Sequence, residues 1–278
     1  VSCLIDNLPP PLQADRNHYA ASATLPTLFA STQHLQEMLI QDPSLNALRD
    51  GSPEASDQQV IALLLVKREE KHVMGIEMAG DTLRRDVAQI VVNFSGHRLA
   101  DPNASEEETR RQLKRRAFDY LLSLALARIS EVKHERTRLD HQRDLLQRKL
   151  RAFQYGSWEF GDAPPTYPEP AELQAELDKI EAELAAMGVN DNLLQTHLGL
   201  IAGVLAKAEQ HFWAEDIELC LDQMNIQRDE SDKSARKIKL QELQDANGRR
   251  LVSLLVSIPL GELPRREDFV TAAKRYLG

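Results

Sequence analysis

Cysteine is scarce in this chain of 278 residues, which contains only Cys3 and Cys220. Disulfides form and persist in oxidising compartments, whereas proteins of reducing compartments keep few cysteines and keep them as free thiols. The sequence therefore predicts a cytoplasmic protein without a structural disulfide.

Long apolar runs are absent as well. No run is long enough to cross a bilayer, so we predict no transmembrane helix and no membrane partner. The first residues, VSCLIDNLPPPLQ, lack a basic stretch followed by an apolar one and are not typical of a secretory signal. The formal net charge of −9 argues against wrapping by nucleic acid over the whole surface, though not against a local basic patch.

The motifs of common catalytic and ligand-binding sites are also missing. The sequence contains no G-x-x-x-x-G-K-[ST] or G-x-G-x-x-G phosphate loop, no H-E-x-x-H or Cys-x-x-Cys metal motif and no G-x-S-x-G nucleophile elbow. We therefore expect no cofactor and no metal, assign no catalytic residue, and favour a non-enzymatic protein.

The segment SGHRLADP, residues 95–102, is the strongest candidate for a polar site, because His97, Arg98 and Asp101 follow a predicted strand. We interpret this segment as an ordinary connection from a strand to a helix. The alternative is an enzyme site assembled in the folded ends of the chain from residues that no motif reveals.

One long helical pattern dominates the middle of the chain. Ser105 and Glu108 have the spacing of a capping box, and neither Gly nor Pro follows before Gly156. From Phe118 to Phe153, apolar residues recur at alternating spacings of four and three, interrupted only by two arginines, which is a heptad seam. The sequence therefore predicts a helix of about 50 residues that needs a partner along its length.

A second seam supplies that partner. The same alternation runs from Leu173 to Phe212, and the loop between the two seams is so short that they can meet only antiparallel. Residues 105–153 carry thirteen basic and eight acidic side chains, while residues 171–212 carry two basic and seven acidic ones. Opposite net charge favours pairing of the two arms. We therefore predict an antiparallel coiled-coil hairpin over 104–213.

Three polar residues occupy seam positions where Leu would be more stabilising: Arg136, Arg143 and Asp191. The two arginines are expected to pack their stems on the seam and extend their charged groups to solvent. The alternative is a polar layer that fixes the register, with Asp191 reached by one of the arginines.

Aromatic residues make up only 5% of the sequence, yet five of them fall in the Gly- and Pro-rich stretch FQYGSWEFGDAPPTYPEP, residues 153–170. The hairpin places the loop 154–170 at its tip. Aromatic side chains concentrate in binding hot spots, so we predict a docking tip for another protein. Its partner-binding residues are Tyr155, Trp158, Phe160 and Tyr167. The alternative is a self-packed aromatic plug that closes the turn.

The two ends of the chain, 1–103 and 214–278, are predicted to form the two halves of one α+β head with a mostly antiparallel sheet. Apolar and alternating runs predict two strands in 60–80 with a charged turn at 67–71, and further strands within 84–96, 216–226, 236–243 and 245–259. Asn247-Gly248 predicts a tight turn before the last strand. Helical patterns occur at 24–41 and 266–278. The alternative for 58–94 is a helical segment.

These patterns favour a protein-protein interaction or scaffold protein, with one contact at the hairpin tip and a second at the head, where a homo-oligomer would form. The alternative is a nucleic-acid-associated factor. Its binding residues would be the basic cluster Arg110, Arg111, Lys114, Arg115 and Arg116. Three glutamates precede this cluster and no aromatic residue is interleaved with it before Phe118, so we favour the interaction protein.

Overall fold

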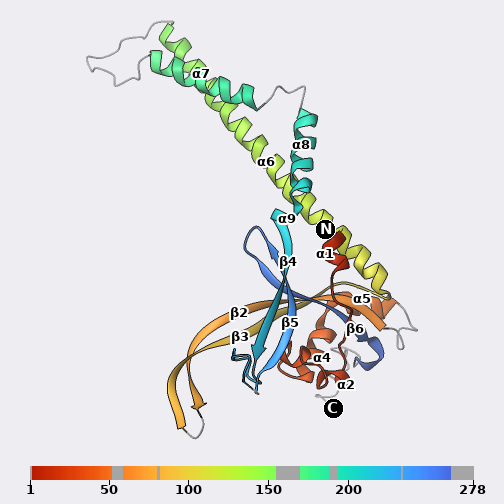
Figure 1. The fold of residues 1–278 in the computed structure, drawn as a ribbon. Coiled ribbons are helices and arrows are strands. Elements are labelled where there is room, and N and C mark those ends of the chain that lie inside the picture. The colour runs from red at the N-terminus through yellow and green to blue at the C-terminus, as the bar shows by residue number, and fades with distance from the viewer. Residues whose placement is uncertain are drawn as a thin grey trace, which may run out of the picture. The chain divides into compact units, whose positions relative to one another are not determined.

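The computed structural model describes residues 2–51, 59–79, 82–154, 170–187, 193–232 and 234–263. The chain divides into two compact units (Figure 1). The head unit comprises Val1–Phe118 and Glu209–Gly278, and the helical unit comprises Asp119–Ala208. Each is described by itself.

A six-stranded sheet forms the centre of the head unit, in the order β3-β2-β6-β5-β4, with β1 beside β6. The strands are β1 (Leu12–Gln13), β2 (Gln59–Ala79), β3 (Thr82–Asn103), β4 (Phe212–Leu221), β5 (Arg236–Asp245) and β6 (Arg250–Pro259). Within the described residues, neighbouring strands are antiparallel except that β1 runs parallel to β6. With its helices, the chain is α+β, as the sequence predicts.

Strand β2 shows that the predicted turn at 67–71 is wrong. β2 continues through these charged residues, and Lys67 and Lys71 face Ser95 and Val91 of β3 in unbroken register. Pairing with β3 gives the backbone N–H and C=O groups their partners, so charged side chains are accommodated on a continuous strand, with Lys67 exposed and Arg68 paired with Glu242 of β5. The helical alternative for 58–94 is wrong for the same reason.

Three bulges curve the β2–β3 pair. The register shifts three times, and each shift adds one residue to β3. The shifts lie beside Asp101, Gly96 and Asp86, whose φ angles are 49°, 64° and 57°. A bulge bends and twists its strand, and Figure 1 shows the pair curving away from the other strands. Residues 95–102 are therefore bulged strand, which corrects the predicted strand-to-helix connection.

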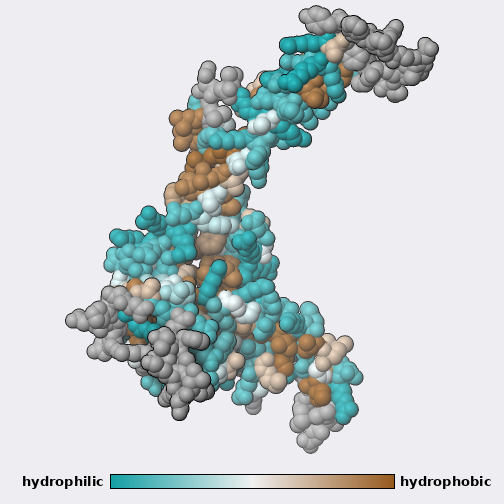
Figure 2. All heavy atoms as spheres, turned by 180° about the vertical axis from the view of Figure 1, so that it is seen from behind, coloured by the Kyte–Doolittle hydropathy of each residue, from teal (hydrophilic) through white to brown (hydrophobic). Residues whose placement is uncertain are grey.

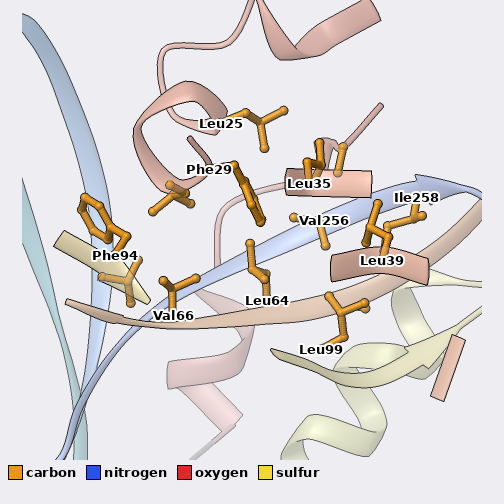
Figure 3. Close-up of a cluster of buried hydrophobic side chains, with 14 of the residues drawn as sticks. Leu25, Phe29, Leu35, Leu39, Leu64, Val66, Phe94, Leu99, Val256 and Ile258 are labelled. Atoms are coloured by element: carbon orange, nitrogen blue, oxygen red, sulfur yellow. The ribbon is translucent and has the colours of Figure 1, made fainter. Parts of the chain in front are cut away.

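Helices of the N-terminal segment cover one face of the sheet. They are α2 (Arg16–Tyr19), α3 (Leu25–Leu28), α4 (Thr32–Gln41) and α5 (Pro43–Gly51). Phe29 and Leu35 are buried in one cluster with Leu64 and Val256 of the strands, and Figure 3 shows the two layers facing each other. The helical pattern predicted at 24–41 is confirmed as two helices, α3 and α4.

The opposite face of the sheet is covered by α1 (Ser2–Asp6) and by the first turns of α6 (Glu106–Gln154). Ile5, Leu8 and Leu113 are buried there with Leu63 and Leu255. Side chains alternate between the two faces of a strand, so consecutive residues of β2 enter different clusters. The buried part of β2 is therefore apolar on both faces.

The turn between β5 and β6 confirms the prediction at Asn247-Gly248. The Asp245 carboxylate accepts hydrogen bonds from the backbone N–H groups of Asn247 and Arg249, at 3.0 and 2.9 Å. Gly248 has a φ of 78°, which glycine adopts without steric cost. The helix predicted at 266–278 lies outside the described residues.

The long helix predicted from residue 105 is confirmed as α6, which has 49 residues. Ser105 Oγ accepts the backbone N–H of Glu108 at 3.2 Å, so this side chain caps the helix. Arg143, one of the seam arginines, pairs with Asp140 and Asp144 of its own helix at 3.1 and 3.0 Å. Asp191 lies outside the described residues.

The helical unit contains the rest of α6 together with α7 (Pro170–Ala186) and α8 (Leu193–Ala206), and the short α9 (Ala208–His211) follows. Leu139 and Leu146 of α6 are buried in one cluster with Leu173, Leu177 and Ile180 of α7. All five are predicted seam residues. The far end of α6 therefore packs on α7 through its heptad positions.

Gly75 of β2 leaves room for the Gln89 side chain of β3. A Cβ atom at position 75 would lie 2.0 Å from Gln89 Oε1, and the buried Gln89 amide donates to the Ile76 carbonyl at 3.3 Å. We expect Gly75→Ala to displace this amide and to lower the free energy of unfolding by about 1–2 kcal/mol, measured by urea denaturation. In a Gln89→Ala background the same change should cost less, and strictly additive losses would contradict this contact.

Candidate functional site

The docking residues predicted at the hairpin tip, Tyr155, Trp158, Phe160 and Tyr167, lie outside the described residues. The described part of the chain contains three other groups of interest: the basic cluster at 110–116, the histidines around His97, and a polar network on the sheet. A fourth feature is the apolar helix α8.

The basic cluster makes contacts inside the head unit. Arg110 donates to the Ile5 and Leu8 carbonyls at 2.6 and 3.0 Å. The ion pairs of the cluster are Arg110–Glu106, Arg111–Glu108, Lys114–Asp6 and Arg116–Asp101, at 2.8, 3.1, 2.7 and 2.6 Å. Arg115 is exposed. Three of these cations, Arg110, Lys114 and Arg116, thus fix the first turns of α6 to the α1 segment and β3.

His97, from the predicted polar segment, packs into the core. Its Nε2 donates to the Leu28 carbonyl at 2.8 Å, and its ring stacks on Phe29 with the centroids 4.5 Å apart. The ring of His34 lies edge-on to that of His97, at 5.2 Å. Burial lowers the pKa of His97 below its ordinary value, outweighing the opposing effect of the bond to Leu28.

The other two members of that segment lie elsewhere. Arg98 is exposed, while Asp101 accepts both Nε and a terminal nitrogen of Arg116, at 2.7 and 2.6 Å. The bulge at Gly96 turns His97 to the helical face of the sheet. His97, Arg98 and Asp101 therefore do not converge on one site.

A buried ion pair joins β5 to β2. Glu242 is only 1% exposed, and its Oε1 accepts from Arg68 Nε at 3.0 Å. Arg68 also pairs with Glu70. Burial favours the neutral form of Arg68, but the carboxylates of Glu242 and Glu70 outweigh it and raise the pKa of the guanidinium. The charge of Glu242 is therefore matched inside the protein.

A second bridge joins β5 to β4. Gln244 Nε2 donates to Glu215 at 2.9 Å and to Glu242 at 3.4 Å, and Trp213 Nε1 donates to Glu215 at 3.2 Å. Glu215 and Glu242 are opposite each other in the β4–β5 register, where like charges repel. The amide of Gln244 and the guanidinium of Arg68 offset this repulsion, so the network links strands and leaves neither carboxylate of the pair unbonded.

The sequence contains a signal for this network that the motif analysis did not use. Ile238 and Leu240 point to the helical face of the sheet, and Glu242 and Gln244 continue the same alternation. A charged residue that interrupts an apolar face needs a partner of opposite charge. The partner, Arg68, is far away in the sequence and could not be identified without the strand order.

Helix α8 exposes an unusual amount of apolar surface. Residues 193–206, LLQTHLGLIAGVLA, contain no charged side chain. Leu194 is 73% exposed and Leu198 56% exposed, and among the described side chains of α8 none is buried. Figure 2 shows the corresponding apolar surface on the helical unit. Contiguous exposed apolar surface is typical of interaction sites.

Potential metal ligands do not gather in the described ranges, where no group of three or more His, Cys, Asp or Glu side chains could hold a metal ion. No helix in the described part of the chain is both long enough and apolar enough to span a membrane. Cys3 and Cys220 are both free thiols.

Comparison with known proteins finds no matching family model, no matching curated protein and no matching solved structure. Any function has to be inferred from the residues of this chain.

His97 makes the stability of the head unit depend on pH. The pKa of His97 in the folded chain lies below the ordinary value of about 6.5. Between these two pKa values, the unfolded chain binds a proton at His97 and the folded chain does not. The contribution of His97 to the free energy of unfolding is therefore fully present above a pH of about 6.5. It falls as the pH drops towards the folded pKa, by at most ~1.4 kcal/mol per pH unit. Urea denaturation across this range should show the loss. His97→Phe keeps the stack on Phe29 and should flatten the dependence, and equal slopes for both proteins would contradict this origin.

Glu242→Gln should leave Arg68 in its half-buried site with only the exposed Glu70 as a counter-charge. We expect a loss of about 2–3 kcal/mol in the free energy of unfolding, somewhat below that of a fully buried broken pair. The double variant Arg68→Met with Glu242→Leu replaces both charges by apolar groups and should recover most of the loss. Equal instability of the single and double variants would show that the ion pair is not the cause.

Proposed function

We propose that this chain is a non-enzymatic, cytoplasmic protein-protein interaction or scaffold protein. In this proposal, α6 pairs along its seam with α7 and α8 as an antiparallel coiled-coil hairpin over 104–213. The loop at its tip binds another protein through Tyr155, Trp158, Phe160 and Tyr167. The head unit supplies a second contact.

The observation that most supports this proposal is the surface of α8. Exposing the apolar side chains of Leu194 and Leu198 to water is unfavourable, and covering them with another apolar surface would lower the free energy. Leu194 and Leu198 are predicted seam residues, so either pairing of α8 with α6 in the hairpin or a bound partner would cover them. The packing of α7 on α6 through predicted seam residues supports the hairpin geometry.

Nucleic-acid binding through Arg110, Arg111, Lys114, Arg115 and Arg116 has less support. Phosphate contacts require cations that are free to approach the backbone of the nucleic acid. Four of the five already form ion pairs with carboxylates of the head unit, and only Arg115 is left without such a pair among the described contacts.

The tip is tested by Trp158→Ala combined with Phe160→Ala. Both residues are in the predicted tip loop, so the melting temperature should be nearly unchanged, while a partner captured from lysate by the wild-type chain should be lost. A photoreactive phenylalanine at position 158 should crosslink to the same protein.

Leu126→Ala is the control, because Leu126 is an apolar residue that is 55% exposed but lies outside both the loop and the seam. It should leave the capture unchanged. If the tip variant loses stability while it still captures the partner, the loop is an aromatic plug and this proposal is wrong.

A further inference from the structure

Strand β2 has a free edge along its distal half. β6 pairs with β2 only from Gln59 to Val66, whereas β3 stays paired with β2 up to Ala79. We call the side of Lys67–Ala79 that faces away from β3 the outer β2 edge. Among the described residues no strand lies against it. Its backbone N–H and C=O groups therefore have no strand partner.

The two edges of this β2–β3 ribbon differ. On the β3 side, the loop after β4 covers the edge: Val92 N–H donates to the Asn225 carbonyl at 2.9 Å, and Gln227 N–H donates to the Ile90 carbonyl at 2.8 Å. The three bulges also lie in β3. Covering segments and bulges are the usual protection of an edge strand, and β2 has neither.

The outer β2 edge also carries exposed apolar side chains. Met74 is 73% exposed, Ile76 59% and Val73 39%. A two-stranded ribbon by itself is marginally stable in water, and a third strand adds hydrogen bonds and covers apolar area. From Val73 to Ile76 this edge is apolar and has no bulge of its own, and such an edge is typical of strand addition.

We propose that the outer β2 edge pairs antiparallel with the same edge of a second copy of this chain. The two-fold axis passes at Met74, so that Met74 faces Met74 of the second copy. His72 then faces Ile76, and Lys71 faces Glu77. The result is one four-stranded sheet of β3, β2 and their counterparts in the second copy.

Charge pairs and apolar contacts together favour this register. Facing residues in an antiparallel pair lie on the same face of the sheet, so Lys71 and Glu77 occupy facing positions twice, once on each side of the axis. A shift of the axis to Val73 would place Glu69 opposite Glu77, which repels. A shift to Gly75 would remove both opposite-charge pairs. A shift to His72 would pair Lys67 with Glu77, but it would place the apolar Met74 and Ile76 opposite Glu70 and Arg68. A two-fold axis perpendicular to the sheet keeps every side chain on its own face. The axis can therefore pass only at a residue that faces its own copy, because a one-residue slip would place side chains of opposite faces together.

The same pattern disfavours nucleic acid as the partner. Lys67–Ala79 contains three basic and three acidic residues, so the segment has no net positive charge to attract nucleic acid. Self-pairing places a basic residue of each copy opposite an acidic residue of the other. This contact would be the head contact of the proposed function, but it does not involve the hairpin tip, so the two can fail separately.

Cysteine crosslinking tests the axis in the full-length chain. In a Cys3→Ser, Cys220→Ser background, Met74→Cys should form an intermolecular disulfide, because the two positions are opposite each other. His72→Cys is the matched control, since the two copies of residue 72 would be separated by four residues along the strand, about 13 Å. It should not crosslink. Crosslinking of both variants, or of neither, would overturn this register.

A charge swap tests the pairing itself. Sedimentation velocity over a concentration series should show that the wild-type chain forms dimers, and that Lys71→Glu or Glu77→Lys each raises the dimer dissociation constant about tenfold. The double variant Lys71→Glu with Glu77→Lys should restore it.

Three results would overturn the proposal: a wild-type chain that stays monomeric at every concentration, dimers that Lys71→Glu leaves unaffected, or a double variant as weak as the single ones. Circular dichroism and thermal unfolding of each variant confirm that the head unit is folded. The tip variant Trp158→Ala with Phe160→Ala should dimerise like wild type, which separates this contact from the tip.

Discussion

The backbone ladder between β2 and β3 is the interaction on which the rest of the head unit depends. Near its base, both faces of β2 are buried, Leu64 under the N-terminal helices and Leu63 under the α1 segment and α6. Beyond Val66, β6 no longer pairs, and the ladder with β3 and the ion pair of Arg68 with Glu242 hold the strand. One strand therefore passes from a core that is closed on both sides to a ribbon with side chains in water, while its backbone remains hydrogen-bonded to β3 throughout.

This change of surroundings explains which parts of the fold the sequence predicts. The long helix α6 and the Asn247-Gly248 turn are set by neighbours in the chain, and both appear as predicted. The charged stretch 67–71 resembles a turn because it follows an apolar run, but what changes there is burial and not backbone direction. The distant strand β3 decides the outcome, and no local pattern contains that information.

The same limit applies to side-chain direction. Each bulge in β3 reverses the alternation of faces, so His97 cannot be assigned to core or surface from its position in the sequence alone. It reaches the core, where burial lowers its pKa. For Glu242, in contrast, the sequence position does predict the face, because the residue alternates with Ile238 and Leu240 and is buried as they are. Only the strand order reveals Arg68 as the partner that makes this burial tolerable.

The two units expose different kinds of surface: apolar side chains in the helical unit and an unpaired strand edge in the head unit. In the helical unit, α7 packs on α6 through Leu173, Leu177 and Ile180, whereas α8 has no charged side chain and exposes Leu194 and Leu198. Apolar attraction is non-directional, so the exposed leucines of α8 suit partners of varied geometry. The outer β2 edge has directional hydrogen-bonding groups in a fixed spacing, and it suits only another extended strand. The proposed self-pairing therefore uses the strand edge, and the proposed binding of another protein uses the helical unit.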